Sequence, residues 1–280
     1  MDVTSVLHDR YQIQAILGHG GFAVTYRALD LQTEQQCAIK SLSFKNIDTW
    51  KTWELFQRES EILKNLNHPQ IPKYIDSFII EKEREVECYL VQQYVEGKSL
   101  AQLIQEGKCF TEQEVIKIAC HLTIILEYLH SFSPPLIHRD ITPNNIILTH
   151  DHQVFLIDFG SVRDKMLLDY TMGGSSTIIG TYGYMPLEQF QGRALPASDI
   201  YALGMTLIYL LSRRSPLALE SYKKNIDIRA YTKISRGFTL ILEKMVHADY
   251  KKRYKTVQKV SQDLTRIKKK KVLFRMRRIV

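Results

Sequence analysis

The first 93 residues contain several short runs with the apolar and polar pattern of β-strands. In residues 11–17, apolar side chains alternate with glutamines, as in a strand with one buried face. Further strand-like runs lie at residues 36–41, 75–80 and 87–93. Residues 52–66 instead repeat their apolar residues at helical spacing. This part of the chain is therefore predicted to form a small antiparallel sheet with one main helix.

Helical patterns dominate the rest of the chain. The predicted helices cover residues 111–132, 200–211, 238–246 and 256–267. The second of these is apolar on nearly all sides, which is typical of a buried helix. Two short apolar runs, 146–148 and 154–157, predict a β-hairpin, whereas residues 215–233 are polar and irregular. We expect a larger and mostly helical second part.

Length and composition fit a folded protein of one large domain or of two lobes sharing a cleft, with 280 residues of which 45% are hydrophobic. The four cysteines form no C-x-x-C pair, so they suggest neither a zinc site nor a disulfide framework, and a reducing cytosol fits. The first ten residues lack the features of a signal peptide. The longest apolar run, 201–211, is too short to span a membrane.

The positive charge is concentrated at the end of the sequence. The net charge is +8, but residues 268–280 carry seven basic residues and no acid, which leaves +1 for the remainder. The basicity therefore belongs to this basic tail, and no nucleic-acid-binding face of the fold is expected. A solvated, disordered terminus is the simpler interpretation of the tail. The alternative is peripheral binding to an anionic membrane, because apolar residues are interleaved with the basic ones.

Residues 138–160 carry the clearest chemistry. They read H-R-D-I-T-P-N-N before the hairpin and D-F-G after it, so polar clusters lie at both ends. Asp140 is a carboxylate able to orient a hydroxyl, and Asn145 and Asp158 are hard oxygen ligands for a small divalent cation. Turn formation alone would explain any one of these residues. The whole spacing closely resembles the catalytic loop and metal loop of the protein kinase family.

A glycine-rich turn follows the first predicted strand. It reads G-H-G-G-F-A-V-T-Y from residue 18, and glycines there let backbone N–H groups approach phosphate oxygens. The turn resembles the kinase nucleotide loop, with Ala23 in place of the third glycine and Val24 placed to pack on an adenine ring. The resemblance implies that ATP is bound by Leu17, Gly18, His19, Gly20, Gly21, Val24, Ala38, Lys40, Gln93, Val95, Asn145 and Asp158, the last two also binding the metal.

Lys40 ends the strand motif C-A-I-K, which resembles the phosphate-binding lysine motif of kinases. On the helix 52–66, Glu59 falls on the flank of the apolar face, whereas Glu54 and Glu61 point away from it. A carboxylate on a packed face requires a cation, and Lys40 is the natural one. The alternative is that Glu59 makes helical surface pairs with Arg58 or Lys64.

The run Y-L-V-Q-Q-Y-V-E-G resembles the last strand of the small kinase lobe and the hinge that follows it. Gln92 would guard the back of the adenine pocket. Gln93 and Val95 would offer backbone groups to the adenine edge.

The segment between Asp158 and Glu188 is rich in hydroxyls and resembles an activation loop, with Arg139, Thr177 and Thr181 as regulatory residues. Its end, G-T-Y-G-Y-M-P-L-E, resembles serine/threonine kinases rather than tyrosine kinases. Glu188 would pair with Arg253. Asp199 reads locally as an ordinary helix N-cap, and by resemblance it would also hold the H-R-D backbone.

One departure concerns the catalytic loop. Serine/threonine kinases usually carry lysine two residues after the H-R-D aspartate, and tyrosine kinases carry arginine two or four residues after it. Here Thr142 and Asn144 hold these positions. A charge that would neutralise the transferring phosphoryl group is missing, so activity is expected to be slow unless another basic group substitutes.

The resemblance covers about residues 10–267 and implies an α+β, bilobal protein-kinase fold. The expected parts are an antiparallel-sheet N-lobe (1–92), a hinge (93–97), a mostly helical C-lobe (98–267) and the basic tail (268–280). The implied function is an ATP- and Mg²⁺- or Mn²⁺-dependent serine/threonine protein kinase of bacterial, especially cyanobacterial, type, acting on proteins in the cytoplasm. The alternatives are a nucleotide-binding pseudokinase scaffold and a membrane adaptor acting through its basic tail.

Overall fold

The computed structural model describes residues 5–19, 23–44, 50–82, 85–162, 180–219 and 226–276. The chain divides into two compact units, Met1–Glu96 (unit 1) and Gly97–Val280 (unit 2). This division lies within residues 93–97, where the sequence predicted a hinge.

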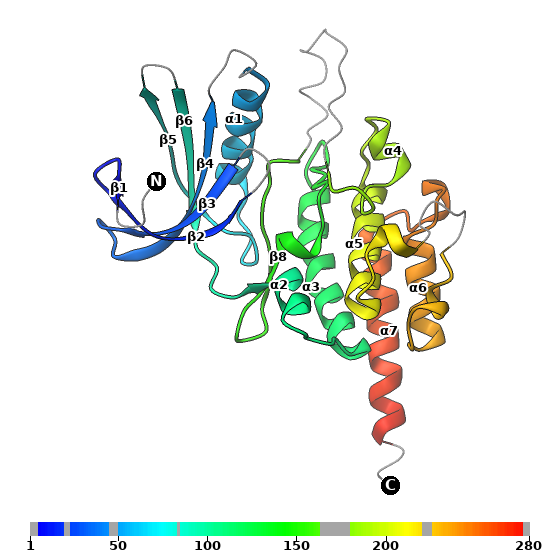
Figure 1. Cartoon of the computed structure of the whole chain (residues 1–280). Coiled ribbons are helices and arrows are strands. Elements are labelled where there is room, and N and C mark those ends of the chain that lie inside the picture. The colour runs from blue at the N-terminus through cyan, green and yellow to red at the C-terminus, as the bar shows by residue number, and fades with distance from the viewer. Residues whose placement is uncertain are drawn as a thin grey trace. The chain divides into compact units, whose positions relative to one another are not determined.

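The described part of unit 1 is a curled antiparallel sheet with one helix (Figure 1). Its six strands lie in the order β1-β2-β3-β4-β6-β5. Their bounds are β1 Val6–Leu7, β2 Tyr11–His19, β3 Ala23–Asp30, β4 Gln35–Phe44, β5 Tyr74–Lys82 and β6 Glu85–Gln93. Helix α1, Trp50–Asn65, packs on β5 and β6. The sheet and the helix are therefore as the sequence predicted, with boundaries shifted by a few residues.

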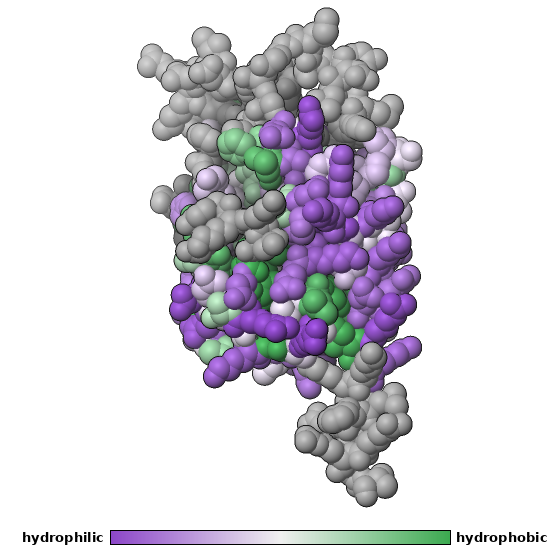
Figure 2. Space-filling view, turned by 90° about the vertical axis from the view of Figure 1, so that its right-hand side faces the viewer, coloured by the Kyte–Doolittle hydropathy of each residue, from purple (hydrophilic) through white to green (hydrophobic). Residues whose placement is uncertain are grey.

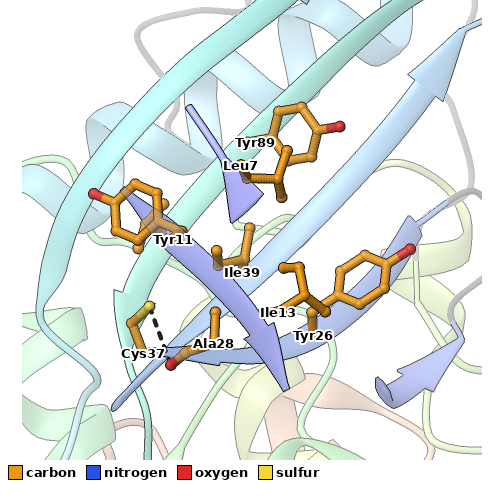
Figure 3. Packing of buried hydrophobic residues seen from close by; sticks show 9 residues of the cluster. Leu7, Tyr11, Ile13, Tyr26, Ala28, Cys37, Ile39 and Tyr89 are labelled. Atoms are coloured by element: carbon orange, nitrogen blue, oxygen red, sulfur yellow. Dashed lines mark hydrogen bonds between the residues drawn. The ribbon is translucent and has the colours of Figure 1, made fainter. Parts of the chain in front are cut away.

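One face of this sheet holds the core of unit 1 (Figure 3). The buried side chains come from β1, β2, β3, β4 and β6, and they are Leu7, Tyr11, Ile13, Tyr26, Ala28, Cys37, Ile39, Tyr89 and Val91. The Cys37 thiol donates to the Ala28 carbonyl at 3.6 Å, and burial raises the pKa of this thiol to about 12. Since side chains alternate along a strand, the neighbours of these residues lie on the opposite face of the sheet.

The described part of unit 2 is mostly helical. A three-stranded sheet of β7 (Lys98–Ser99), β8 (Ile146–Leu148) and β9 (Val154–Leu156) accompanies the helices. The α-helices are α2 Leu100–Gln105, α3 Glu112–His130, α4 Leu187–Phe190, α5 Pro196–Ser212, α6 Arg236–Met245 and α7 Val257–Met276. Short 3₁₀ helices are η2 Pro143–Asn145, η4 Pro216–Leu219, η5 Ile228–Ala230 and η6 Tyr250–Lys252.

Local chemistry explains where these helices begin and how they pack. Thr111 caps α3 through a capping box with Glu114, and Ser99 caps α2 in the same way with Gln102. Helix α5 is buried along almost its whole length, and α3, α6 and α7 pack against it. Hydrophilic side chains cover most of the face that bears α6 and α7, with apolar areas between them (Figure 2).

The end of α7 differs from the prediction. The sequence predicted a helix end at residue 267 and favoured a disordered tail after it, but helical backbone continues to Met276. Lysine is a good helix former, and neither glycine nor proline interrupts residues 268–276. The first part of the basic tail is therefore helical.

Candidate active site

In unit 1, Lys40 and Glu59 form the predicted ion pair. The Lys40 Nζ atom lies 3.0 Å from Oε1 and 2.9 Å from Oε2 of Glu59. Only 17% of the Lys40 side chain and 6% of the Glu59 side chain are exposed. Because Ile39 belongs to the core face, Lys40 and Ala38 lie on the opposite face of β4. This face of the sheet therefore carries a lysine that the Glu59 carboxylate holds.

The glycine turn connects β2 and β3. Gly18 pairs with Thr25 and His19 with Val24, while a register shift leaves Leu17 in a bulge between Ile16 and Gly18. Gly20 and Gly21 lie outside the described residues. The strand pairing thus places the ends of the turn close together in unit 1.

The prediction for Val24 is wrong. Val24 packs against the core cluster of unit 1, on the same face of β3 as Tyr26 and Ala28. Thr25, its neighbour in β3, pairs directly with Lys40 and so lies on the face that carries the lysine. Because side chains alternate in a strand, a shift of one residue moves the predicted contact to the opposite face. We therefore remove Val24 from the candidate site.

The predicted hinge begins at the end of β6. Gln92 pairs with Ala38 of β4, so its side chain lies on the same face as Lys40. The backbone N–H of Gln93 donates to the backbone carbonyl of Lys73 at 2.8 Å. Val95 follows the strand and is half-buried. The predicted role of Gln92 at the back of the adenine pocket stays a prediction.

In unit 2, the H-R-D segment is held by its backbone. Asp199 is fully buried, and it accepts hydrogen bonds from the His138 amide at 3.0 Å and the Arg139 amide at 2.9 Å. The sequence predicted this contact by resemblance. The N-cap interpretation is wrong, however, because α5 begins at Pro196 and Asp199 lies within its first turn. Its carboxylate is therefore directed to the loop rather than to the start of its own helix.

Asp140, the predicted catalytic carboxylate, has hydrogen bonds on both oxygens. Its Oδ2 accepts from the Asn145 side-chain amide at 2.8 Å. Its Oδ1 accepts from the Thr181 amide at 3.0 Å and from the Thr181 hydroxyl at 2.7 Å. Thr181, predicted as regulatory, thus contacts the carboxylate itself. Arg139 just before it has a left-handed φ of 72°, which costs about 1–2 kcal/mol and requires support from its surroundings.

Asn145 and Asp158 lie at the same end of the β8–β9 hairpin. The Ile157 amide donates to the Asn145 carbonyl at 2.9 Å, which brings the two segments side by side. Asp158 has a φ of 64°, and one of its carboxylate oxygens accepts from the Gly160 amide at 3.3 Å. Since the Asn145 nitrogen faces Asp140, its amide oxygen is directed elsewhere. This pair of hard oxygen donors fits Mg²⁺ or Mn²⁺.

The predicted Glu188–Arg253 pair is present and buried. The Arg253 side chain is 0% exposed, and its Nη1 lies 2.6 Å from Oε1 of Glu188. The guanidinium also donates to the carbonyls of His247, Ala197 and Ala248. This set of bonds attaches α4 to the segment before α7.

The His138 side chain, the first of the H-R-D motif, is fully buried. Burial lowers the pKa of His138, which favours the neutral form of the ring, and the ring packs edge-on to Phe159 with ring centroids 5.0 Å apart. Sequence reasoning missed His130, whose Nε2 lies 2.9 Å from Asp199, and Gln189, whose amide donates to the Arg139 carbonyl at 2.7 Å. Neither shows a periodicity or motif that would single it out.

Thr177, predicted as a regulatory residue, lies outside the described residues.

Comparison with known proteins agrees with this geometry. A family model described as the protein kinase domain matches residues 11–265. The chain is 36% identical to serine/threonine-protein kinase B of Synechocystis sp., over 91% of this chain and 46% of the relative. It is also 36% identical to serine/threonine-protein kinase PknA of Nostoc sp., over 92% and 47%.

A more distant relative is serine/threonine-protein kinase PrkC of Bacillus subtilis, 33% identical over 77% of this chain and 32% of the relative. The chain thus spans about half the length of its cyanobacterial relatives. The predicted bilobal fold and the predicted bacterial and cyanobacterial resemblance are both confirmed. The chain belongs to the protein kinase domain family.

Proposed function

We propose that this chain transfers the γ-phosphoryl group of ATP to serine or threonine hydroxyls of proteins. The observation that carries the proposal is the Asp140 carboxylate, which Asn145 and Thr181 hold from opposite oxygens. A carboxylate fixed in this way can orient an acceptor hydroxyl and accept its proton. The names of the relatives support this function, and none of those compared is named a pseudokinase or an adaptor.

The other residues of the site bind and neutralise charge. Lys40, fixed by Glu59, would contact the α- and β-phosphates of ATP. Asn145 and Asp158 would hold Mg²⁺ or Mn²⁺, and a bound divalent cation would neutralise the charge of the phosphates. The remaining proposed ATP contacts are Leu17, Gly18, His19, Gly20, Gly21, Ala38, Gln93 and Val95. Catalysis by these residues consists of positioning and charge neutralisation rather than covalent chemistry.

Incubation with labelled ATP, Mg²⁺ and a generic basic protein tests the proposal. The wild-type chain should transfer phosphate to serine and threonine, and Asp158→Asn should remove most of this activity. The control is Asp140→Asn, which keeps the shape of the side chain but removes the negative charge. Equal phosphotransfer by wild type and Asp140→Asn would contradict the function and the site together.

Control by phosphorylation of the activation loop is a second part of the proposal. Thr177 stands four residues before Thr181, and Arg139 beside Asp140 would give a phosphate at residue 177 a cationic partner. Mass spectrometry of active protein should find phosphate among Ser175, Ser176 and Thr177, and Thr177→Ala should be less active. Full activity of unmodified protein would exclude the switch.

The third part concerns place in the cell, which we propose to be the cytoplasm and the inner face of the membrane. Each basic residue near an anionic bilayer adds about 1 kcal/mol of attraction. Lys268 and Lys269 are exposed on α7, and the helix continues through the basic tail to Met276. Among the described residues, no helix combines the length and apolar character that crossing a bilayer requires. The proposed binding is peripheral and electrostatic, so it should weaken with salt.

Liposome sedimentation separates these possibilities. Wild type should sediment with vesicles that contain acidic lipid and less with neutral ones. Since a cut at residue 267 falls inside α7, replacing the four lysines 268–271 by glutamine is a better variant than truncation. Equal sedimentation of wild type and this variant would exclude the membrane role and leave the kinase assignment unaffected.

A further inference from the structure

The peptide unit between Arg139 and Asp140 determines the direction in which the Asp140 side chain leaves the backbone. On the amide side of Arg139, Asp199 fixes the chain with the 2.9 Å bond from the Arg139 N–H. Arg139 has a left-handed φ of 72°, a conformation that a residue with a side chain adopts only when its surroundings impose it. The N–H of that peptide, on Asp140, donates to Nδ1 of His138 at 3.4 Å, at the long end of the hydrogen-bond range, so the rotation of the peptide needs a closer contact on its carbonyl side.

Gln189 supplies that contact on the carbonyl side. Its Nε2 donates to the Arg139 carbonyl at 2.7 Å, and only 2% of Gln189 is exposed. A carbonyl oxygen only accepts, so the nitrogen end of the Gln189 amide must face it. Because the contact is buried, bulk water does not replace the Gln189 donor when it is lost.

Gly180 lies directly beside this hydrogen bond and leaves no room there for a side chain. A Cβ at residue 180 would lie 2.7 Å from Nε2 of Gln189 and 3.0 Å from the Arg139 carbonyl oxygen. Gly180 also has a φ of 131°, which disfavours any side chain there. The next residue, Thr181, donates twice to Asp140. Gln189 therefore contacts the segment that carries the carboxylate and packs against the segment that carries Thr181.

We propose that Gln189 is a positioning residue for the phosphotransfer step, which orients the Arg139–Asp140 peptide and so aims the Asp140 carboxylate at the acceptor hydroxyl. The inference rests on the proposed kinase function and extends it to a residue that touches neither ATP nor the acceptor. Small errors in the position of a catalytic group reduce rates strongly. Loss of the Gln189 hydrogen bond should therefore lower kcat, while KM for ATP, which depends on other residues, stays near the wild-type value.

Two substitutions separate the hydrogen bond from simple packing. Gln189→Met keeps the length of the side chain and removes the donor. Gln189→Glu keeps the shape, and its carboxyl group donates only when protonated. The titratable and charged groups on the segments that Gln189 joins are the same in all variants; they are His138, Arg139, Asp140 and Asp199 around the loop and Glu188 on α4. Gln191, exposed at the end of the same helix, provides the matched controls Gln191→Met and Gln191→Glu.

The measurement is kcat and KM of the full chain from about pH 6 to about pH 8.5, with thermal melting of each variant to verify folding. At the high end, both Gln189 variants should lose at least about tenfold in kcat. Burial raises the pKa of a carboxyl group, so Gln189→Glu should recover toward wild type as the pH falls, whereas Gln189→Met should not. The Gln191 variants should match wild type throughout.

The outcomes are distinct. If the wild-type chain exceeds Asp140→Asn but folded Gln189→Met keeps more than half of its kcat, the positioning role is excluded and the kinase function stands. The same holds if Gln189→Glu equals wild type at every pH. If Gln189→Met does not fold, the pH dependence of Gln189→Glu alone decides. A wild-type chain no more active than Asp140→Asn removes the proposed function, and this inference with it.

Discussion

Each unit holds one side chain that we propose to take part in phosphotransfer, and the two side chains are held in position by different means. In unit 1, Lys40 projects from a regular strand, and the carboxylate of Glu59 on α1 holds its ammonium group. In unit 2, Asp140 lies on an irregular loop, and much of its support acts on the backbone around it, through Asp199 and Gln189. The difference arises because a strand fixes its own backbone, whereas a loop needs side chains from elsewhere to do so.

Function and stability should be linked less closely in unit 1 than in unit 2. In unit 1, the Lys40–Glu59 pair that we propose to serve function lies on the face of the sheet opposite the core, so activity and folding should be separable. In unit 2, the supports of the loop are themselves buried and hydrogen-bonded, so their loss should affect both properties. Substitutions in both units can test this contrast.

The largest effect is expected in unit 2 for Arg253→Lys. The Arg253 guanidinium donates to Glu188 and to three backbone carbonyls, and a lysine ammonium cannot reach all of them. We expect a loss of about 3 kcal/mol in the free energy of unfolding, visible in calorimetry as a midpoint lower by about 10 °C. Activity should fall as well. Arg266→Lys, at an exposed pair with Asp263, is the control and should change little.

In unit 1, Lys40→Met should reduce kcat by about a hundredfold, which is about 2.7 kcal/mol of activation free energy. It also leaves the Glu59 carboxylate buried without Lys40, so some stability is lost. Adding Glu59→Gln should restore the melting temperature but not the activity. If the double variant recovers neither the melting temperature nor the activity, function and folding are not separable at the Lys40–Glu59 pair. Lys64→Met, at an exposed pair with Glu61 on α1, should leave activity unchanged.

Asp30→Asn should cost unit 1 about 2 kcal/mol at neutral pH without changing the specific activity of folded protein. Two hydrogen bonds from Arg10 hold the pKa of this buried carboxyl well below its usual range. A depressed pKa adds stability above the unfolded-state pKa of about 4 and loses it as the pH falls further. Urea unfolding at several pH values should therefore show the variant approaching wild type only below about pH 4. Asp9→Asn, at an exposed position, should show no such change.

The smallest effect is expected for Thr142→Lys in unit 2. An added cation should raise kcat by up to about tenfold, or 1.4 kcal/mol, if the phosphoryl group lacks a positive partner. Thr142 is only 1% exposed, so a longer side chain must also overpack the site. Thr142→Met measures that packing cost without the charge. A kcat no higher than that of Thr142→Met would show that another cation already serves the site.

Helical periodicity and the resemblance of C-A-I-K to the kinase lysine motif together predict the contact in unit 1. The 100° spacing of α1 placed Glu59 at the flank of the apolar face, and the carboxylate indeed meets Lys40. A prediction from strand alternation requires the exact residue register. Val24 was assigned to the ligand side, but it packs with Tyr26 and Ala28 on the core side, because an error of one residue inverts the face.

The supports of the loop in unit 2 were harder to predict, because they depend on tertiary contacts rather than on local pattern. Asp199 was interpreted locally as an N-cap, since its place inside α5 depends on a helix start at Pro196. Its contact with the H-R-D backbone came only from the family resemblance. Gln189 has no pattern at all, because a single buried glutamine is defined by the carbonyl it meets 50 residues away.

The hydrogen bonds that the Asp199 carboxylate accepts also affect how fast backbone amides exchange with solvent. Amides in irregular loops usually exchange fast, because a small local opening exposes them. The amides of His138 and Arg139 instead donate to a fully buried carboxylate on α5. They should exchange only when α5 separates from the loop, at rates close to those of the slowest amides in unit 2. Hydrogen exchange at this loop would then report the global opening of unit 2.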